Sequence, residues 1–68
     1  MNSRKKDQAV LAAFKPGEQL DTAQTLSRVH CMSWAQVFRS MIRLEKRGYL
    51  QRVWDDIYAA QPKSIDNV

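Results

Sequence analysis

The side chains best suited to bind another molecule are concentrated between residues 33 and 47. Arginine presents a rigid fork of N–H donors that fits a phosphate group or the edge of guanine, and glutamine can form a matching pair of hydrogen bonds with adenine. In this stretch such residues recur at spacings of three and four, which puts several of them on one face of a helix. The candidate contact residues are Ser33, Gln36, Arg39, Ser40, Arg43 and Arg47. They predict a surface that binds a polyanion.

The charge distribution supports a polyanionic partner. The 68-residue chain has 11 Lys and Arg residues against 7 Asp and Glu residues, a net charge of +4. A mildly basic total by itself often serves only solubility. The positive charge is uneven, however, because it collects in residues 34–53 and in an N-terminal arm, residues 1–6, whereas residues 54–68 are net acidic. Basic arms can track phosphate groups, so further candidate contacts with a polyanion are Arg4, Lys5, Lys6 and, after the helix, Arg52.

Two capping boxes define the elements that must position these side chains. Asp21 is followed three residues later by Gln24, and Ser33 is followed by Gln36 in the same way. Each pair can satisfy free backbone N–H groups at the start of a helix. Their spacing leaves room for a short helix and a turn before a second helix, over about residues 34–47.

The chain before these helices predicts one more helix. It is expected to begin at Ser3 or Asp7 and to end near Phe14, because the residue before a proline avoids the helical region. Its apolar face would carry Val10, Leu11 and Phe14. Pro16-Gly17 suits the centre of a type II turn, and residues 18–20 are expected to be extended.

The chain after residue 47 predicts a β-hairpin. Gly48 can end the helix in a left-handed conformation. The β-prone runs 49–54 and 57–60 flank Asp55-Asp56, which is expected to form a two-residue turn. Helical spacing assigns the buried face of the two central helices to Leu26, Val29, Val37, Met41 and Leu44.

Several residues occupy the places that a helix-turn-helix requires. Ser27 is the small residue in the middle of the motif's first helix, and Met32 and Val37 are the apolar residues after its turn. Cys31 stands where a glycine-like residue is usual. The run Leu-Glu-Lys-Arg-Gly-Tyr-Leu over 44–50 is a helix-end signature that precedes a wing. In these features the chain resembles the bacterial winged helix-turn-helix transcriptional regulators of the small single-domain type.

The resemblance implies a mainly α fold with a small β-hairpin, made of three helices and a two-stranded wing. The domain would span residues 7–61, between a flexible basic arm, 1–6, and a flexible tail, 62–68. It further implies sequence-specific binding of double-stranded DNA in transcriptional regulation, with the helix over 34–47 as the recognition helix in the major groove. One such helix reads few base pairs, so a homodimer or cooperative neighbours are expected. The family's wing usually carries basic residues that contact DNA, whereas this one carries Asp55 and Asp56. The alternative role for this hairpin is to brace the fold.

An alternative function is a winged-helix module that binds a partner protein and no DNA. Trp34, Phe38 and Ile42 widen the apolar surface of the third helix, and they either cover the first helix or form an interface. Trp54 and Tyr58 are candidates for the same patch. An RNA-binding winged helix is a third possibility.

Nothing in the sequence points to catalysis, a cofactor or a small-molecule ligand. His30 and Cys31 are too few to hold a structural zinc ion, and the pair Asp55-Asp56 has no pocket-forming context. A single cysteine excludes an internal disulfide. No apolar run approaches a membrane span, and no signal-peptide pattern is present. The expectation is a cytoplasmic protein that is not an enzyme and binds no metal.

Overall fold

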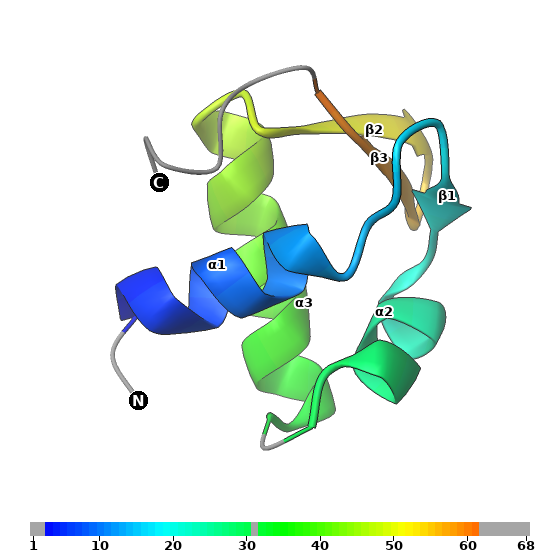
Figure 1. Cartoon of the computed structure of the whole chain (residues 1–68). Coiled ribbons are helices and arrows are strands. Elements are labelled where there is room, and N and C mark those ends of the chain that lie inside the picture. The colour runs from blue at the N-terminus through cyan, green and yellow to red at the C-terminus, as the bar shows by residue number, and fades with distance from the viewer. Residues whose placement is uncertain (1–2, 31, 62–68) are drawn as a thin grey trace.

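The computed structural model of the chain describes residues 3–30 and 32–61. These residues form three helices and a three-stranded antiparallel sheet, in the order α1 (Ser3–Ala12), β1 (Gln19–Leu20), α2 (Thr22–Arg28), α3 (Trp34–Lys46), β2 (Leu50–Trp54) and β3 (Ile57–Ala60). Figure 1 shows α1 lying across α3, with α2 near the N-terminal end of α3 and the sheet near its C-terminal end. A mostly helical fold with a small sheet is the class that the sequence predicted. No helix of the described segments is long and apolar enough to cross a membrane.

Both predicted capping boxes are confirmed. The Asp21 side chain accepts the backbone N–H of Gln24 at 2.7 Å, and Gln24 Oε1 accepts the N–H of Asp21 at 3.0 Å. Ser33 Oγ accepts the N–H of Gln36 at 3.2 Å, and Gln36 Oε1 accepts the N–H of Ser33 at 2.9 Å. A cap of this kind stabilises a helix by about 1 kcal/mol. The starts of α2 and α3 are therefore determined by residues only three positions apart.

The end of α3 is confirmed at Gly48, in a Schellman motif. Gly48 has a φ of +84°, in the left-handed region that glycine tolerates best. Its N–H donates to the carbonyl oxygen of Glu45 at 3.0 Å, and the N–H of Tyr49 donates to that of Leu44 at 2.9 Å. These bonds satisfy the last carbonyl groups of the helix and turn the chain directly into β2.

The sheet has one strand more than the sequence predicted. Its strand order is β1-β3-β2, and β2 and β3 are antiparallel neighbours connected by Asp55 and Asp56. A register shift between Arg52 and Trp54 places one extra residue on β2, which marks a bulge. The additional strand, β1, arises from the segment that was expected only to be extended. It follows a turn in which Gly17 has a φ of +76°, and it pairs with β3 on the side away from β2.

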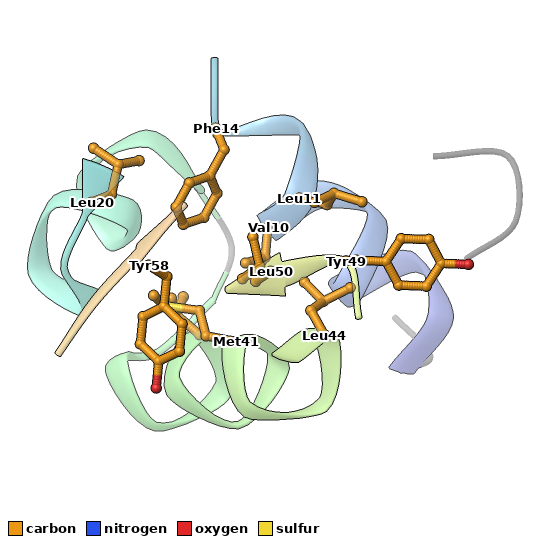
Figure 2. Packing of buried hydrophobic residues seen from close by; sticks show 10 residues of the cluster. Val10, Leu11, Phe14, Leu20, Met41, Leu44, Tyr49, Leu50 and Tyr58 are labelled. Carbon is orange, nitrogen blue, oxygen red and sulfur yellow. The ribbon is translucent and has the colours of Figure 1, made fainter. Parts of the chain in front are cut away.

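The core lies between α1, α3 and the sheet, where Figure 2 shows their side chains meeting. Its buried apolar residues are Val10, Leu11, Phe14, Leu20, Val37, Met41, Leu44, Tyr49, Leu50 and Tyr58. The apolar faces predicted for α1 and α3 are thus confirmed. Because Tyr58 is 1% exposed, it cannot belong to an outer patch with Trp54, and that expectation is wrong.

The buried face of α2 differs from the prediction. Leu26 and Val29 are only partly buried and pack against the edge of the core. The fully buried residues of this helix are Thr22 and Thr25. Threonine is tolerated there because its hydroxyl has a partner: Thr25 Oγ1 donates to the carbonyl oxygen of Asp21 at 2.8 Å.

The first helix begins at Ser3, the earlier of its two predicted starts. Arg4, Lys5 and Lys6 therefore belong to the first turns of α1 and not to the flexible arm expected over residues 1–6. Asp7, in the next turn, is buried against α3, which holds the preceding turn in the helix. Residues 1, 2 and 31 and the expected tail, 62–68, lie outside the described residues.

Candidate nucleic-acid interface

The outward face of α3 is the part of the helix that the core leaves uncovered. Successive residues of an α-helix are rotated by about 100°, so Val37, Met41 and Leu44 gather on one side of α3. The exposed residues of α3 are Trp34, Ala35, Arg39 and Lys46. Two of these four are cations, and the face therefore combines positive charge with apolar surface.

Ser40 does not lie on this outward face, contrary to expectation. Its exposed fraction is 0%, and its Oγ accepts a hydrogen bond from Arg43 Nη2 at 3.0 Å. The reason is its position, three residues after Val37 and four before Leu44, on the buried side of the helix. Ser40 is therefore removed from the candidate contacts.

Arg43 is held by a buried carboxylate that the sequence did not single out. Asp7 is 2% exposed, and its carboxylate accepts N–H groups of Arg43 at 2.7, 3.1 and 3.2 Å. These hydrogen bonds raise the pKa of the Arg43 guanidinium above its ordinary value. The pair joins α1 to α3, so the expectation that Arg43 is available to read a base is wrong. Spacing could have revealed Asp7, because it lies three residues before Val10 and four before Leu11, on the apolar face of α1.

Ser33 and Gln36 are committed to the cap of α3. The bidentate contact of a glutamine with adenine needs both the carbonyl oxygen and the amide nitrogen. The Oε1 atom of Gln36 already accepts the N–H of Ser33, and Ser33 Oγ accepts the N–H of Gln36. While the cap is formed, the groups that can still donate to a ligand are the side-chain amide of Gln36 and the hydroxyl hydrogen of Ser33.

A shallow, open depression lies between the first turns of α1 and the N-terminal half of α3. Its lining residues are Ser3, Lys6, Gln36, Arg39 and Arg43. Arg39 is exposed and Lys6 is half-buried. Two predicted regions, the basic N-terminal segment and α3, thus meet at one surface. Because Asp7 neutralises Arg43, the positive charge available to a phosphate group at this depression comes from Lys6 and Arg39.

The remaining predicted contacts lie on α1, at the C-terminal end of α3 and on β2. Arg4 and Lys5 are exposed in α1, and Arg47 is exposed as the C-cap of α3. Arg52 lies on β2, where its Nε atom is 3.5 Å from Glu45 Oε2. That ion pair partly neutralises Arg52, although 52% of its side chain remains exposed.

One of the two acidic residues between β2 and β3 has an internal role. Asp56 Oδ1 accepts the hydroxyl of Thr22 at 2.9 Å, and Asp56 Oδ2 accepts the Thr22 N–H at 3.4 Å. Since Thr22 is the first residue of α2, these bonds tie the connection between the strands to the start of that helix. The contact braces the fold, and it turns the charge of Asp56 toward α2.

Aromatic residues make up the apolar part of the surface. Trp34 and Phe38 stack with their ring centroids 5.1 Å apart and their planes inclined by 12°. Trp34 is 50% exposed, and Trp54, at the end of β2, is 72% exposed. Exposed tryptophans are costly in water, so both are candidates for contact with another molecule.

A third ion pair holds the segment between α1 and α2. Arg28 Nη2 donates to Glu18 Oε2 at 2.7 Å, and Arg28 Nη1 donates to the carbonyl oxygen of Ala13 at 3.1 Å. The hydrogen bond from Arg28 lowers the pKa of Glu18 from 4.5 to about 2. Arg28 is thus engaged in positioning α2 against the turn that precedes β1.

Residues 3–30 and 32–61 contain no group of three or more His, Cys, Asp and Glu residues placed to hold a metal ion. Comparison of the chain with protein-family models, with curated proteins and with solved structures finds no match.

Proposed function

We propose that this chain is a winged-helix protein that binds double-stranded DNA, with α3 as the recognition helix in the major groove. The observation that carries the proposal is the outward face of α3, where Arg39 and Lys46 are exposed on a helix whose two ends are both capped. An α-helix fits the major groove, and cations on it attract the phosphates on either side. The order helix, turn, helix, antiparallel strand pair is the order that a winged helix requires.

The depression between α1 and α3 supports a phosphate contact beside the groove. Lys6 and Arg39 line it from different helices, and Ser3 adds a hydroxyl group. Phosphate contacts fix how a protein sits on the duplex, and base contacts then supply specificity. In this arrangement Arg39 is placed to contact either a phosphate or a base, whereas Arg43 holds α1 against α3.

The strand pair β2–β3 takes the place of the wing. Arg52 is its candidate phosphate contact, and Asp56 fastens the connection to α2. The role of this wing in the proposal is mainly to brace the fold. Because a single recognition helix reads few base pairs, the proposal includes a homodimer on paired half-sites. The proposed biological role is transcriptional regulation in a bacterial cytoplasm.

The experiment that tests this function measures duplex binding against salt concentration. Affinity should fall steeply with salt, with a slope that reports the number of phosphates neutralised. Arg39→Ala should weaken binding by about tenfold, or about 1.4 kcal/mol, which lies within the range of about 1–3 kcal/mol for a base contact. Lys46→Ala should lower the salt slope by about 1 if Lys46 contacts a phosphate.

A matched control separates these effects from the loss of net charge. Lys15→Ala removes one charge from an exposed residue on the turn between α1 and β1, and it should change affinity little. Arg43→Ala is unsuitable as a probe because it also breaks the ion pair with Asp7. Absence of duplex binding at low salt, or equal effects of Arg39→Ala and Lys15→Ala, would contradict the proposal.

The second candidate function is a module that binds a partner protein through its aromatic surface. The exposure of Trp34 and Trp54 is the observation that favours it. It predicts that Trp34→Ala abolishes a protein contact and that salt has little effect. The cations of α3 favour DNA as the first candidate.

A further inference from the structure

Trp34, Phe38 and Ile42 form a row along α3 that the hydrophobic core does not absorb. They are spaced by four residues, so their side chains follow one another along the helix surface. Neither the core of the described residues nor the set of partly buried side chains packed against it contains any of the three. Phe38 and Ile42 are half-buried and Trp34 is exposed, so the row borders the core and Trp34 is its most open member.

The stack between Trp34 and Phe38 makes the N-terminal half of the apolar row rigid. The two rings are nearly parallel, and half of the Trp34 surface stays open to solvent. A side chain already fixed by a neighbour loses less conformational entropy when a ligand contacts it. The pair is thus a preorganised apolar surface at the start of α3.

Cations border the apolar row. Arg39 follows Phe38 in the chain and is exposed, and Lys46 lies one turn beyond Ile42 and is exposed as well. Glu45 is paired with Arg52. An apolar row bordered by cations is complementary to a ligand with apolar groups set between negative ones.

Duplex DNA has that pattern in its major groove. The 5-methyl group of thymine is the apolar group that the base edges present there, and phosphates border the groove on both sides. The N-terminal residues of a recognition helix are the ones that approach base edges. We infer that Trp34 and Phe38 read the 5-methyl groups of thymines. This inference rests on the proposed function, in which α3 enters the major groove.

The test replaces thymine with deoxyuridine, which pairs in the same way and lacks only the methyl group. Binding sites are first selected from random duplexes with the full chain, and each thymine of a selected site is then replaced in turn. At the positions read by the stack, the affinity should fall by about fourfold, the change expected for burial of one methyl group. This measurement on the unaltered protein needs no variant to fold.

Two variants assign the effect to the stack. In Trp34→Ala the same deoxyuridine replacements should change the affinity much less, because the exposed half of the stack is gone. Lys15→Ala alters an exposed residue on the turn between α1 and β1, and it should keep the full response to deoxyuridine. Circular dichroism and thermal unfolding check that both variants fold.

Each contrary outcome overturns a different statement. Duplex binding that ignores deoxyuridine at every position would overturn the methyl-reading role and leave the proposed function standing. If Trp34→Ala loses self-association and the protein shows no response to deoxyuridine, the methyl-reading role is overturned, and Trp34 instead contacts a second copy of the chain. No duplex binding at low salt would overturn the proposed function itself.

Discussion

Asp7 and Arg43, 36 positions apart in the chain, form a bidentate ion pair that fastens α1 to α3. The carboxylate is 2% exposed, whereas 40% of the Arg43 side chain is open to solvent. A buried charge with its partner removed is expensive, because water can no longer solvate it. The ion pair thus keeps two helices together beside the candidate interface, and it takes Arg43 out of direct base recognition.

Asp7→Asn should destabilise the protein by about 2 kcal/mol, since hydrogen bonds to charged groups contribute about 1.5–3 kcal/mol. The free energy of unfolding from urea titration, with circular dichroism as the signal, measures the loss. Asp55→Asn removes the same charge from an exposed position and should change stability little. Equal stability of the Asp7 and Asp55 variants would contradict a structural role for the ion pair.

Thr22→Val should destabilise the protein by about 1 kcal/mol, because it removes the hydroxyl donor to Asp56 while keeping the side-chain shape. The measurement is a double-mutant cycle with Asp56→Ala. If the contact exists in solution, the double variant is less destabilised than the two single losses added together. Strict additivity would show that the connection between β2 and β3 is not tied to α2.

Gly48→Ala should destabilise the protein by about 1–2 kcal/mol, because its φ of +84° is unfavourable for a residue with a Cβ atom. The midpoint of thermal unfolding should fall accordingly. Gly48→Asn should lower the stability less than Gly48→Ala does, since asparagine tolerates the left-handed region better than alanine. Identical losses in the two variants would point to a cause other than backbone strain.

Acid should weaken the link between Glu18 and Arg28. Arg28 lowers the pKa of Glu18 to about 2 from an ordinary value of 4.5, so the ionised carboxylate is favoured in the folded state. Its contribution to stability is fully present above pH 4.5 and is lost as the pH falls from 4.5 towards 2. Glu18→Gln should therefore show a shallower decline of unfolding free energy over this range. An NMR titration that returns a pKa near 4.5 for Glu18 would rule the explanation out.

Local signals account for most of the fold that was predicted. The caps at Asp21 and Ser33 involve residues three positions apart, and the Schellman motif at Gly48 depends on one turn of helix. The burial of Val37, Met41 and Leu44 follows from helical periodicity. Such features depend on neighbours in the chain, and for this reason they can be read before any tertiary contact is known.

The candidate site was predicted less well, because its composition depends on which helix covers which face. Helical spacing places Ser40 and Asp7 on the buried sides of their helices, but it could not tell that Arg43 would pair with Asp7. That pairing depends on how α1 packs against α3. Arg39 keeps its predicted place on the exposed side of α3.

By itself, the sequence determined where α2 and α3 begin, where α3 ends, which residues form the apolar faces of α1 and α3, and where positive charge collects. Only the tertiary structure decided how the charged and polar residues are used. The Thr22–Asp56 contact joins residues 34 positions apart, and the depression brings Lys6 beside Arg39. Capping and periodicity act within one turn of helix, whereas the pairing of a buried charge is settled only when distant segments meet.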